Sequence, residues 1–586
     1  MKLNEVIIIL KRLYKEYVGK YFKRILLSIF LSIIVAASTS ATAWLLDPAV
    51  KKIFIDKDRT SAWLIPILIV LAFATKGICL YLARMNIIKV GARIGGELQQ
   101  RITNYILIAD IKTLENRHSG KVISNIFYDT GAVTHLVSTG VLNIVKDGFS
   151  LIALVSLMFY QNWQLASYAI FIMPLAIIFA KSLGKRIGKA QVEGSAKAGV
   201  LMVLLTEIFK ASKMIRIYQK EKVESENAKI AINQAVEKNI KIASIMIRAA
   251  PVMETLTGFM IAGFIFYSGI LISAGELEIN NFFSFLAAMM LAYQPIRSLA
   301  TINMVIYQGA EASKRIFTVV DEPIETKNDS SLPALKIEKC SIKFENVGFR
   351  YLNTKVKAIN NINLNIAGGS MTAFVGHSGA GKSTIINLLP RFYEPEEGQI
   401  YIDNQNIHKV TLESLRKNIS LVSQDVILFD DTIRANIAYA NSEASEKEIL
   451  EACDYAAATE FINKLPRGFE TTIGENGVRI SGGQKQRLSI ARAIMSNPKI
   501  FIFDDCLSAV DTETENRIIS NLKSVMSQTT SIIITHRVSS SIGSNKIIVL
   551  DHAEIVETGT HSQLITQKGF YADSYEKQLL TKEEIV

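Results

Sequence analysis

A glycine-rich stretch in the second half of the chain carries the residue types that bind nucleotide phosphates. Glycines let backbone N–H groups wrap phosphates, Lys382 can reach the β- and γ-phosphates, and Ser383 can bind Mg²⁺. The apolar segment 371–375 predicts a strand before it, and 384–389 predicts a helix whose N-terminus favours an anion. A plain glycine turn, the alternative, does not require these flanking elements. The predicted ATP-binding loop is Gly376, His377, Ser378, Gly379, Ala380, Gly381, Lys382, Ser383 and Thr384.

Two acidic residues end a second apolar segment. The segment 499–503 predicts a buried strand, and Asp504 and Asp505 follow it directly. A carboxylate at the end of a strand beside a phosphate-binding loop is the expected second Mg²⁺ ligand, and we assign this role to Asp504. Asp505 is then expected nearer the water that attacks the γ-phosphate. The alternative, two solvated acids, leaves their pairing with the phosphate-binding loop unexplained.

Alternating strands and amphipathic helices must position these residues. Residues 341–576 contain short β-rich segments between helical ones, which predicts an α/β P-loop NTPase domain. Residues 321–340 predict a linker, because the segment DEPIETKNDSSLP is polar and lacks an apolar run. Residues 577–586 are expected to form a C-terminal tail.

The first half, residues 1–320, has the composition of a membrane domain. The chain has 586 residues, of which 49% are hydrophobic and 20% charged, with a mean hydropathy of +0.25. This mixture indicates one membrane part and one water-soluble part. A bilayer-spanning helix needs about 20 mostly apolar residues. We predict an α-helical membrane domain with six spanning helices, at about 24–47, 63–84, 137–160, 163–181, 248–273 and 281–300.

Lysine and arginine predict the orientation of these spans. Basic residues are dense between residues 11 and 24 and in the connections 85–136 and 182–247, so these parts are expected in the cytoplasm. The loop 275–280 has no basic residue and is expected outside, whereas 48–62 is mixed in charge. Both termini and the ATP-binding domain are then cytoplasmic. The net charge of +11 fits an anionic membrane surface, and no nucleic-acid partner is expected.

Further motifs resemble those of ABC ATPases, in the family's order and spacing. The chain is therefore identified as similar to ABC exporter half-transporters, in which a membrane domain is fused to an ATPase domain. The similarity implies an ATP hydrolase coupled to transport, working as a dimer whose two ATPase domains close head-to-tail around two ATP molecules. The matching positions are the signature motif Ile480, Ser481, Gly482, Gly483 and Gln484 (the family usually has leucine first), the D-loop Ser508 to Asp511, the Q-loop Gln424, the switch His536 and the adenine-stacking Tyr351.

The resemblance also implies which of these residues bind the nucleotide and Mg²⁺ and which act in catalysis. Lys382, Ser383 and Asp504 of one subunit would bind phosphate and Mg²⁺, and the signature residues of the other subunit would complete that site. Gln424 would serve both the metal and catalysis, and His536 would act in catalysis beside Asp505. Asp511 would lie at the nucleotide between the subunits.

Asp505 departs from the family, which usually has glutamate at this position. The aspartate side chain is one methylene shorter, and general-base help is worth roughly 10²–10⁴-fold. We expect an active but slow homodimer. Two alternatives remain open: the weakly hydrolysing half of a heterodimer, and a regulatory partner subunit.

Three basic residues in or beside the spans are candidates for substrate contact: Lys76, Lys146 and Arg297. Charges at membrane depth usually face a cavity, but snorkelling or pairing, for instance with Asp147, also explains them. The segments around Lys146 and Arg297 are similar to the bacterial lipid A-core flippase and multidrug exporter family, which implies basic residues facing an inner chamber. The implied function is export of a phosphorylated lipid across the inner membrane, with amphipathic drugs as the alternative.

Overall fold

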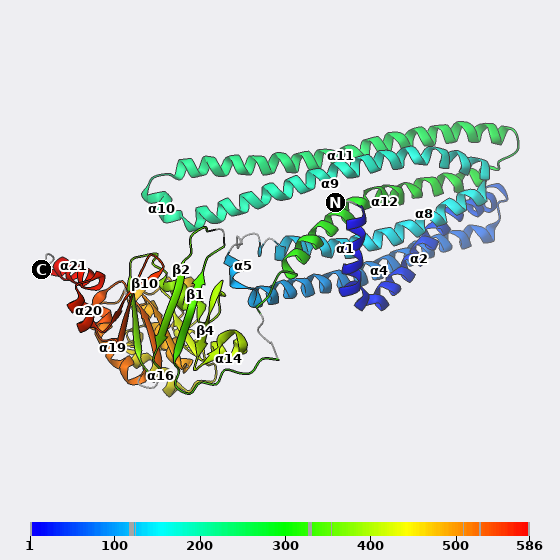
Figure 1. Ribbon diagram of the computed structural model, residues 1–586. Helices are drawn as coiled ribbons and strands as arrows, with labels where there is room; N and C mark the ends of the chain where they lie inside the picture. The colour runs from blue at the N-terminus through cyan, green and yellow to red at the C-terminus, as the bar shows by residue number, and fades with distance from the viewer. Residues whose placement is uncertain are drawn as a thin grey trace. The chain divides into compact units, whose positions relative to one another are not determined.

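The computed structural model describes residues 3–115, 122–123, 125–325, 331–352, 354–507, 509–526 and 529–583. It divides into two compact units, coloured from blue to green and from green to red in Figure 1. The membrane unit comprises Met1–Ala109 and Glu115–Pro323, and the nucleotide unit comprises Asp110–Leu114 and Ile324–Val586. The division after Pro323 falls inside the predicted linker, of which 326–330 lie outside the described residues.

Helices account for most of the described residues in the first 320. The π-helical segments η2, η3 and η4 interrupt or extend the α-helices. In chain order the elements are α1 (Leu3–Glu16), η1 (Val18–Tyr21), α2 (Phe22–Trp44), α3 (Leu46–Pro48), η2 (Ala49–Ile55), α4 (Arg59–Ile108), α5 (Ile111–Glu115), η3 (Asn125–Asp129), α7 (Thr130–His135), η4 (Leu136–Gly140), α8 (Val141–Gln161), α9 (Trp163–Lys210), α10 (Ser212–Ile217), α11 (Glu221–Ser273) and α12 (Ile279–Val320).

Each predicted span overlaps one of these helices, which are α2, α4, α8, α9, α11 and α12. Among the described residues, four continuous helical stretches are long and apolar enough to cross a membrane, and a shorter apolar segment lies at Gly258–Ser273. Large apolar side chains on α4, such as Trp63 and Leu71, are exposed, as expected of a lipid-facing surface. The number of crossings stays a prediction. The four stretches are Val18–Ile55, Arg59–Ile108, Ile126–Gln161 and Ile279–Val320.

Helices α4, α9, α11 and α12 are each far longer than a bilayer is thick. Helix α9 has 48 residues and α11 has 53. At 1.5 Å per residue, α11 is about 80 Å long, against a hydrocarbon core of about 30 Å. Helices α9 and α11 pack side by side along their length and meet at α10 (Figure 1). The predicted connection 182–247 is therefore helical, as an extension of these helices with a turn at its tip.

Two sheets organise the nucleotide unit. The smaller is antiparallel where β1 pairs with β2 and β4, in the order β2-β1-β4-β5, and the larger has the order β10-β9-β3-β8-β7-β6. The strands are β1 (Ile342–Phe349), β2 (Ile359–Ile366), β3 (Met371–Gly376), β4 (Glu397–Ile402), β5 (Gln405–Asn406), β6 (Ile419–Val422), β7 (Ile500–Asp504), β8 (Thr530–Ile534), β9 (Lys546–Asp551) and β10 (Glu554–Gly559).

Helices cover and flank these sheets. Helix α18 carries the signature motif at its start and packs against α15 and α16. The helices are α13 (Lys382–Leu388), α14 (Leu412–Lys417), α15 (Ile433–Ala438), α16 (Glu446–Tyr455), α17 (Thr459–Asn463), α18 (Gly482–Met495), α19 (Thr512–Met526), α20 (His561–Gln567) and α21 (Phe570–Glu583), with short 3-10 turns η5 (Ile407–Lys409), η6 (Gly468–Glu470), η7 (Glu475–Gly477) and η8 (Val538–Ser541).

Strand β7 explains why the functional loops meet at one edge. Ile500 and Ile502 lie in one hydrophobic core while Phe501 and Phe503 lie in another, so the strand is buried on both faces. Strands β3, β8, β7 and β6 run parallel as neighbours, so their carboxyl ends lie at the same edge of the sheet. Ligands bind beyond that edge in open α/β sheets. The loops that follow these strands hold most of the predicted site.

Candidate functional site

The phosphate-binding loop joins β3 to α13. The strand ends at Gly376 and the helix begins at Lys382, within two residues of the predicted bounds. Gly381 has a φ of +102°, and a Cβ there would lie 2.5 Å from the carbonyl oxygen of Ala358. Only glycine fits this left-handed backbone and this close approach. The loop is thus shaped by its glycines, and the start of α13 presents backbone N–H groups to an anion.

Lys382 lies against its own loop. Its Nζ donates hydrogen bonds of 2.7 Å to the carbonyl oxygens of Gly376 and His377, and its side chain is buried. Burial lowers the pKa of Lys382, while the charges of Asp504 and Asp505 oppose that shift. The ammonium group is therefore preset near the loop and close to both acids.

Ser383 and Asp504 provide the oxygen atoms of a candidate Mg²⁺ site. The Ser383 hydroxyl donates to Asp504 Oδ1 at 3.4 Å. Burial raises the pKa of Asp504, and the neighbouring Asp505 adds to this, so a nearby cation would stabilise the ionised form. Among the described residues no group of three or more His, Cys, Asp or Glu side chains could hold a metal. Mg²⁺ does not need one, because it binds through one or two carboxylates, waters and substrate phosphates.

Asp505, His536 and Gln424 follow three neighbouring strands. Asp505 comes directly after β7, and its N–H donates to the carbonyl oxygen of Ile534 at 3.0 Å. His536 lies two residues after β8, near enough for its charge to act on Asp504, and Gln424 lies two residues after β6. Asp505 has a φ of +45°, a left-handed conformation that aspartate tolerates better than most residues. The structure brings the three predicted catalytic side chains to one sheet edge.

Tyr351 lies beside the first turn of α13. Its hydroxyl is 3.2 Å from the Thr384 hydroxyl. Its ring makes edge contacts with Phe349 and Tyr393, with centroids 5.0 and 5.2 Å away. The aromatic ring is thus fixed next to the phosphate-binding loop, in a place that suits a contact with the nucleotide base.

The signature motif is attached to the D-loop. Ser481 caps α18 in a reciprocal arrangement with Gln484: Ser481 N–H donates to Gln484 Oε1 at 2.9 Å, and Gln484 N–H donates to Ser481 Oγ at 3.3 Å. Gly482 and Gly483 form the first turn, where a Cβ on Gly483 would lie 2.9 Å from the carbonyl oxygen of Ala509. This close approach explains the second glycine.

The D-loop in turn begins helix α19. Gln486 Oε1 accepts a hydrogen bond from Ala509 N–H at 3.2 Å, and Asp511 Oδ1 accepts one from Thr514 N–H at 2.9 Å. The hydrogen bond from Thr514 lowers the pKa of Asp511. Ser508 lies outside the described residues. Asp511 is exposed, so a helix cap is its contact within the chain and its carboxylate remains accessible.

The three basic membrane residues lie on three helices. Lys76 lies on α4 and Lys146 on α8, two helices that contact each other. Lys146 also forms an ion pair with Asp147, which is buried. Arg297 on α12 is exposed. The structure therefore places two of the three on contacting helices and shows local pairing for Lys146.

Comparison with known proteins identifies the family. Residues 359–508 match the ABC transporter family, and residues 25–296 match the ABC transporter transmembrane region. The chain belongs to the ABC transporter family. This ABC transporter carries both parts in one chain, which confirms the predicted membrane domain followed by a P-loop NTPase domain.

Full-length relatives narrow the class of ABC transporter. The ATP-dependent lipid A-core flippase of Syntrophus aciditrophicus is 36% identical over 584 residues, covering 100% of this chain and 96% of that protein. The flippase of the same name from Desulfotalea psychrophila is 35% identical over 570 residues, with 97% and 99% covered. The structure of a bacterial Atm1-family ABC exporter with ATP bound matches with a TM-score of 0.86 and 28% identity, covering 95% and 98%. This ABC transporter is thus an ATP-driven exporter with the type 1 exporter fold, and it couples ATP hydrolysis to transport.

Sequence reasoning missed three side chains that hold the predicted loops: Gln486, Glu515 and Gln578. Gln486 binds the D-loop, Glu515 binds the segment after His536, and Gln578 binds the backbone of His536. Glu515 could have been noticed as an acid on the apolar face of α19, but its partners, Arg537 and Ser540, come from the segment that follows β8. Nothing in the local sequence singles out Gln578.

Proposed function

We propose that this ABC transporter flips a phosphorylated, amphipathic lipid across a bacterial inner membrane as a homodimer. The full-length similarity to flippases named for lipid A-core carries this proposal. The cations Lys76 and Lys146 on the contacting helices α4 and α8 support it, because cations at membrane depth suit a phosphorylated headgroup. The basic connections between spans favour an ATPase domain in the cytoplasm.

In the proposed ATP site, residues of one copy bind the phosphates. Lys382 exchanges the carbonyl oxygens of Gly376 and His377 for phosphate oxygens, which requires only a rotation of its side chain. Ser383 and Asp504 would hold Mg²⁺, which would supply positive charge that neutralises the phosphates. Tyr351 stacks on adenine.

A second copy completes the same site. Its Ser481, Gly482 and Gly483 add backbone and hydroxyl donors, and its D-loop Asp511 faces the shared nucleotide. Two sets of donors on one ATP make the nucleotide the link between the subunits, and hydrolysis removes that link. The proposed membrane domains respond by exchanging two global states, as alternating access requires.

Hydrolysis itself is assigned to the sheet-edge residues. Asp505 accepts a proton from the attacking water, Gln424 orients that water and would help to hold the metal, and His536 stabilises the γ-phosphate. The shorter side chain of Asp505 predicts a slow but active enzyme. ATPase measurement on the purified chain alone tests the homodimer. Activity that appears only after a second, different half-transporter is added would contradict it.

The substrate is tested by stimulation of ATP hydrolysis in nanodiscs. We expect lipid A to raise the rate more than zwitterionic phospholipids or hydrophobic dyes do. The double variant Lys76→Gln/Lys146→Gln should lose this stimulation and keep the basal rate. Lys52→Gln, an exposed lysine of η2, is the matched control and should respond as the wild type does. Stimulation by dyes but not by lipids would overturn the lipid proposal in favour of drug export.

A further inference from the structure

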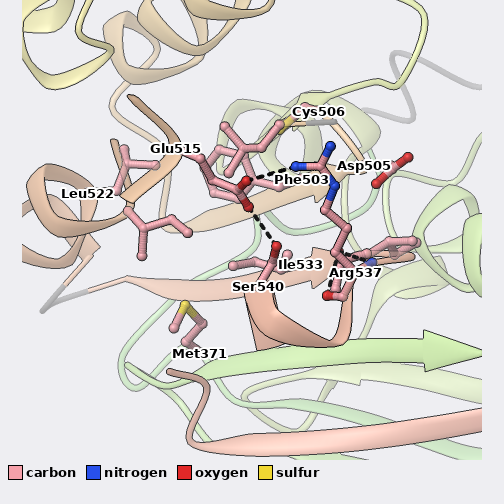
Figure 2. Close-up of a pocket in the computed structure, with 13 residues that line it drawn as sticks. Met371, Phe503, Asp505, Cys506, Glu515, Leu522, Ile533, Arg537 and Ser540 are labelled. Carbon is pink, nitrogen blue, oxygen red and sulfur yellow. Dashed lines mark hydrogen bonds and ion pairs between the residues drawn. The ribbon is translucent and has the colours of Figure 1, made fainter. Parts of the chain in front are cut away.

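The loop that carries His536 is anchored by the buried residues Thr535, Val538 and Ser541, whereas His536 itself is not packed into the core. It runs from Thr535 to Ser541, and the His536 side chain is exposed. Thr535 Oγ1 accepts a hydrogen bond from Arg537 N–H at 3.0 Å, which folds the loop locally. A cavity of about 30 Å³ lies beside the loop and is lined by Asp505, Cys506 and Arg537 among others (Figure 2). A cavity of this size is large enough for a water molecule, so the loop is not closely packed on this one side.

A buried carboxylate holds the loop on this side. Glu515 on α19 accepts a hydrogen bond from Arg537 Nη1 at 3.2 Å with Oε2, and one from the Ser540 hydroxyl at 2.6 Å with Oε1. Glu515 is only 6% exposed. Figure 2 shows its carboxylate between Arg537 and Ser540, with Asp505 at the same cavity. A buried carboxylate without partners is strongly unfavourable, so these two contacts are strongly favoured.

The same glutamate belongs to the first turns of the helix that follows the D-loop. Its N–H donates to the carbonyl oxygen of Asp511 at 2.9 Å. The D-loop is in turn bound to the signature helix through Gln486 and Ala509. A continuous series of contacts therefore leads from the signature helix, through the D-loop, to Glu515 and the loop of His536.

We propose that Glu515 is a positioning residue for ATP hydrolysis: its carboxylate ties the loop that carries His536 to the D-loop. This inference rests on the proposed role of His536. In the proposed dimer the D-loop and signature motif face the partner's nucleotide, whereas His536 serves its own. Glu515 then transmits the closure of one site to the switch histidine of the other.

Other contacts keep the loop folded when Glu515 is changed. Gln578 on α21 donates from Nε2 to the carbonyl oxygen of His536 at 2.9 Å, and its Oε1 accepts from Val538 N–H at 2.8 Å. These two bonds hold the residues on either side of Arg537 to α21. Loss of Glu515 therefore frees the loop from the D-loop without unfolding it.

The test compares Glu515→Gln with Glu513→Gln in the full-length chain. Both changes remove one charge within the same turn of α19, but Glu513 is exposed. We expect Glu515→Gln to lower kcat about tenfold and to change KM and nucleotide affinity less than twofold, as for the loss of one charged hydrogen-bonded contact. Glu513→Gln should match the wild type. An unchanged kcat in Glu515→Gln, or an equal loss in Glu513→Gln, would overturn the proposal.

A double variant separates positioning from general stability. If Glu515 acts through His536, the variant His536→Ala/Glu515→Gln hydrolyses ATP no more slowly than His536→Ala alone. Losses that multiply would contradict the proposal. Should Glu515→Gln fold poorly, Ser540→Ala removes only the hydroxyl contact; it should lower kcat about threefold, and an unchanged kcat would count against the proposal. All assays use basal hydrolysis, so failure of the lipid proposal does not affect their outcome. A wild-type rate in His536→Ala would refute the role of His536 itself.

Discussion

The nucleotide unit and the membrane unit place their functional residues in different ways. In the nucleotide unit three of the motifs are short, contiguous stretches at the ends of buried parallel strands, so β3, β7 and β8 deliver Lys382, Asp504 and His536 to one edge. In the membrane unit the candidate residues lie singly on α4, α8 and α12, and their surroundings depend on how these helices pack. The first arrangement is specified locally, whereas the second exists only through tertiary structure.

Lys382→Ala should have the largest effect on ATP hydrolysis. It tests most directly whether a short, contiguous stretch of sequence specifies the nucleotide site. The lysine is buried at the loop and its role there depends on no other element. We expect ATP hydrolysis to fall about 10³-fold. This is the usual cost of losing a hydrogen-bond donor that stabilises the negative charge formed in the transition state. Phosphate release is the measurement, and Lys409→Ala, an exposed lysine of the same unit, is the control. Hydrolysis near the wild-type rate in Lys382→Ala would break the assignment of the loop.

Asp505 comes next, because it is the position at which this chain departs from its family. We expect Asp505→Asn to lower kcat about 10²-fold and Asp505→Glu to raise it several-fold, since the longer side chain reaches further toward the water. Glutamate tolerates the φ of +45° less well than aspartate, so Asp505→Glu should also lower Tm by a few degrees. Both are measured on the purified chain. Indifference to asparagine would instead favour the regulatory partner subunit.

The sequence predicts the local parts of the site well and the contacts between them poorly. The strand, loop and helix around Lys382 and the end of β7 at Asp504 are as predicted, because each is encoded within about ten residues. Glu515 and Arg537 are distant in sequence, and their contact depends on where α19 lies against β8. The pairing of Lys146 with Asp147 was an open alternative, since adjacent helix residues do not face each other in general.

Replacing either of two aspartates of the nucleotide unit by neutral asparagine should affect the Tm differently. Burial raises the pKa of Asp504, so its ionised form destabilises the folded state; stability falls as pH rises from the unfolded pKa to the folded one. Asp504→Asn should therefore raise the Tm of the nucleotide-free chain by about 2–4 °C at pH 7. A lower Tm would show that neighbouring groups already stabilise the ionised carboxylate of Asp504.

Asp511 is the matched comparison. The Thr514 hydrogen bond lowers its pKa, so its contribution is present above the unfolded pKa and is lost as pH falls. Asparagine also caps helices, and Asp511→Asn should leave Tm at pH 7 unchanged or slightly lower. Thermal unfolding of the two variants at pH 7 is the measurement. An equal rise in both would mean that the sheet edge repels acids in general rather than Asp504 in particular.

Substitutions at Lys146 have the smallest expected effect. They show whether this residue of the membrane unit has a structural role or contacts the substrate. If pairing is its main role, Lys146→Gln leaves the buried Asp147 unpaired and lowers Tm by a few degrees, and adding Asp147→Asn restores it. If substrate contact is its main role, Asp147→Asn alone frees the ammonium group and raises lipid-stimulated hydrolysis, with little change in Tm. Restoration of Tm without any effect on stimulation would make Lys146 a structural residue. The substrate proposal would then rest on Lys76 and Arg297, two exposed or half-buried cations without that constraint.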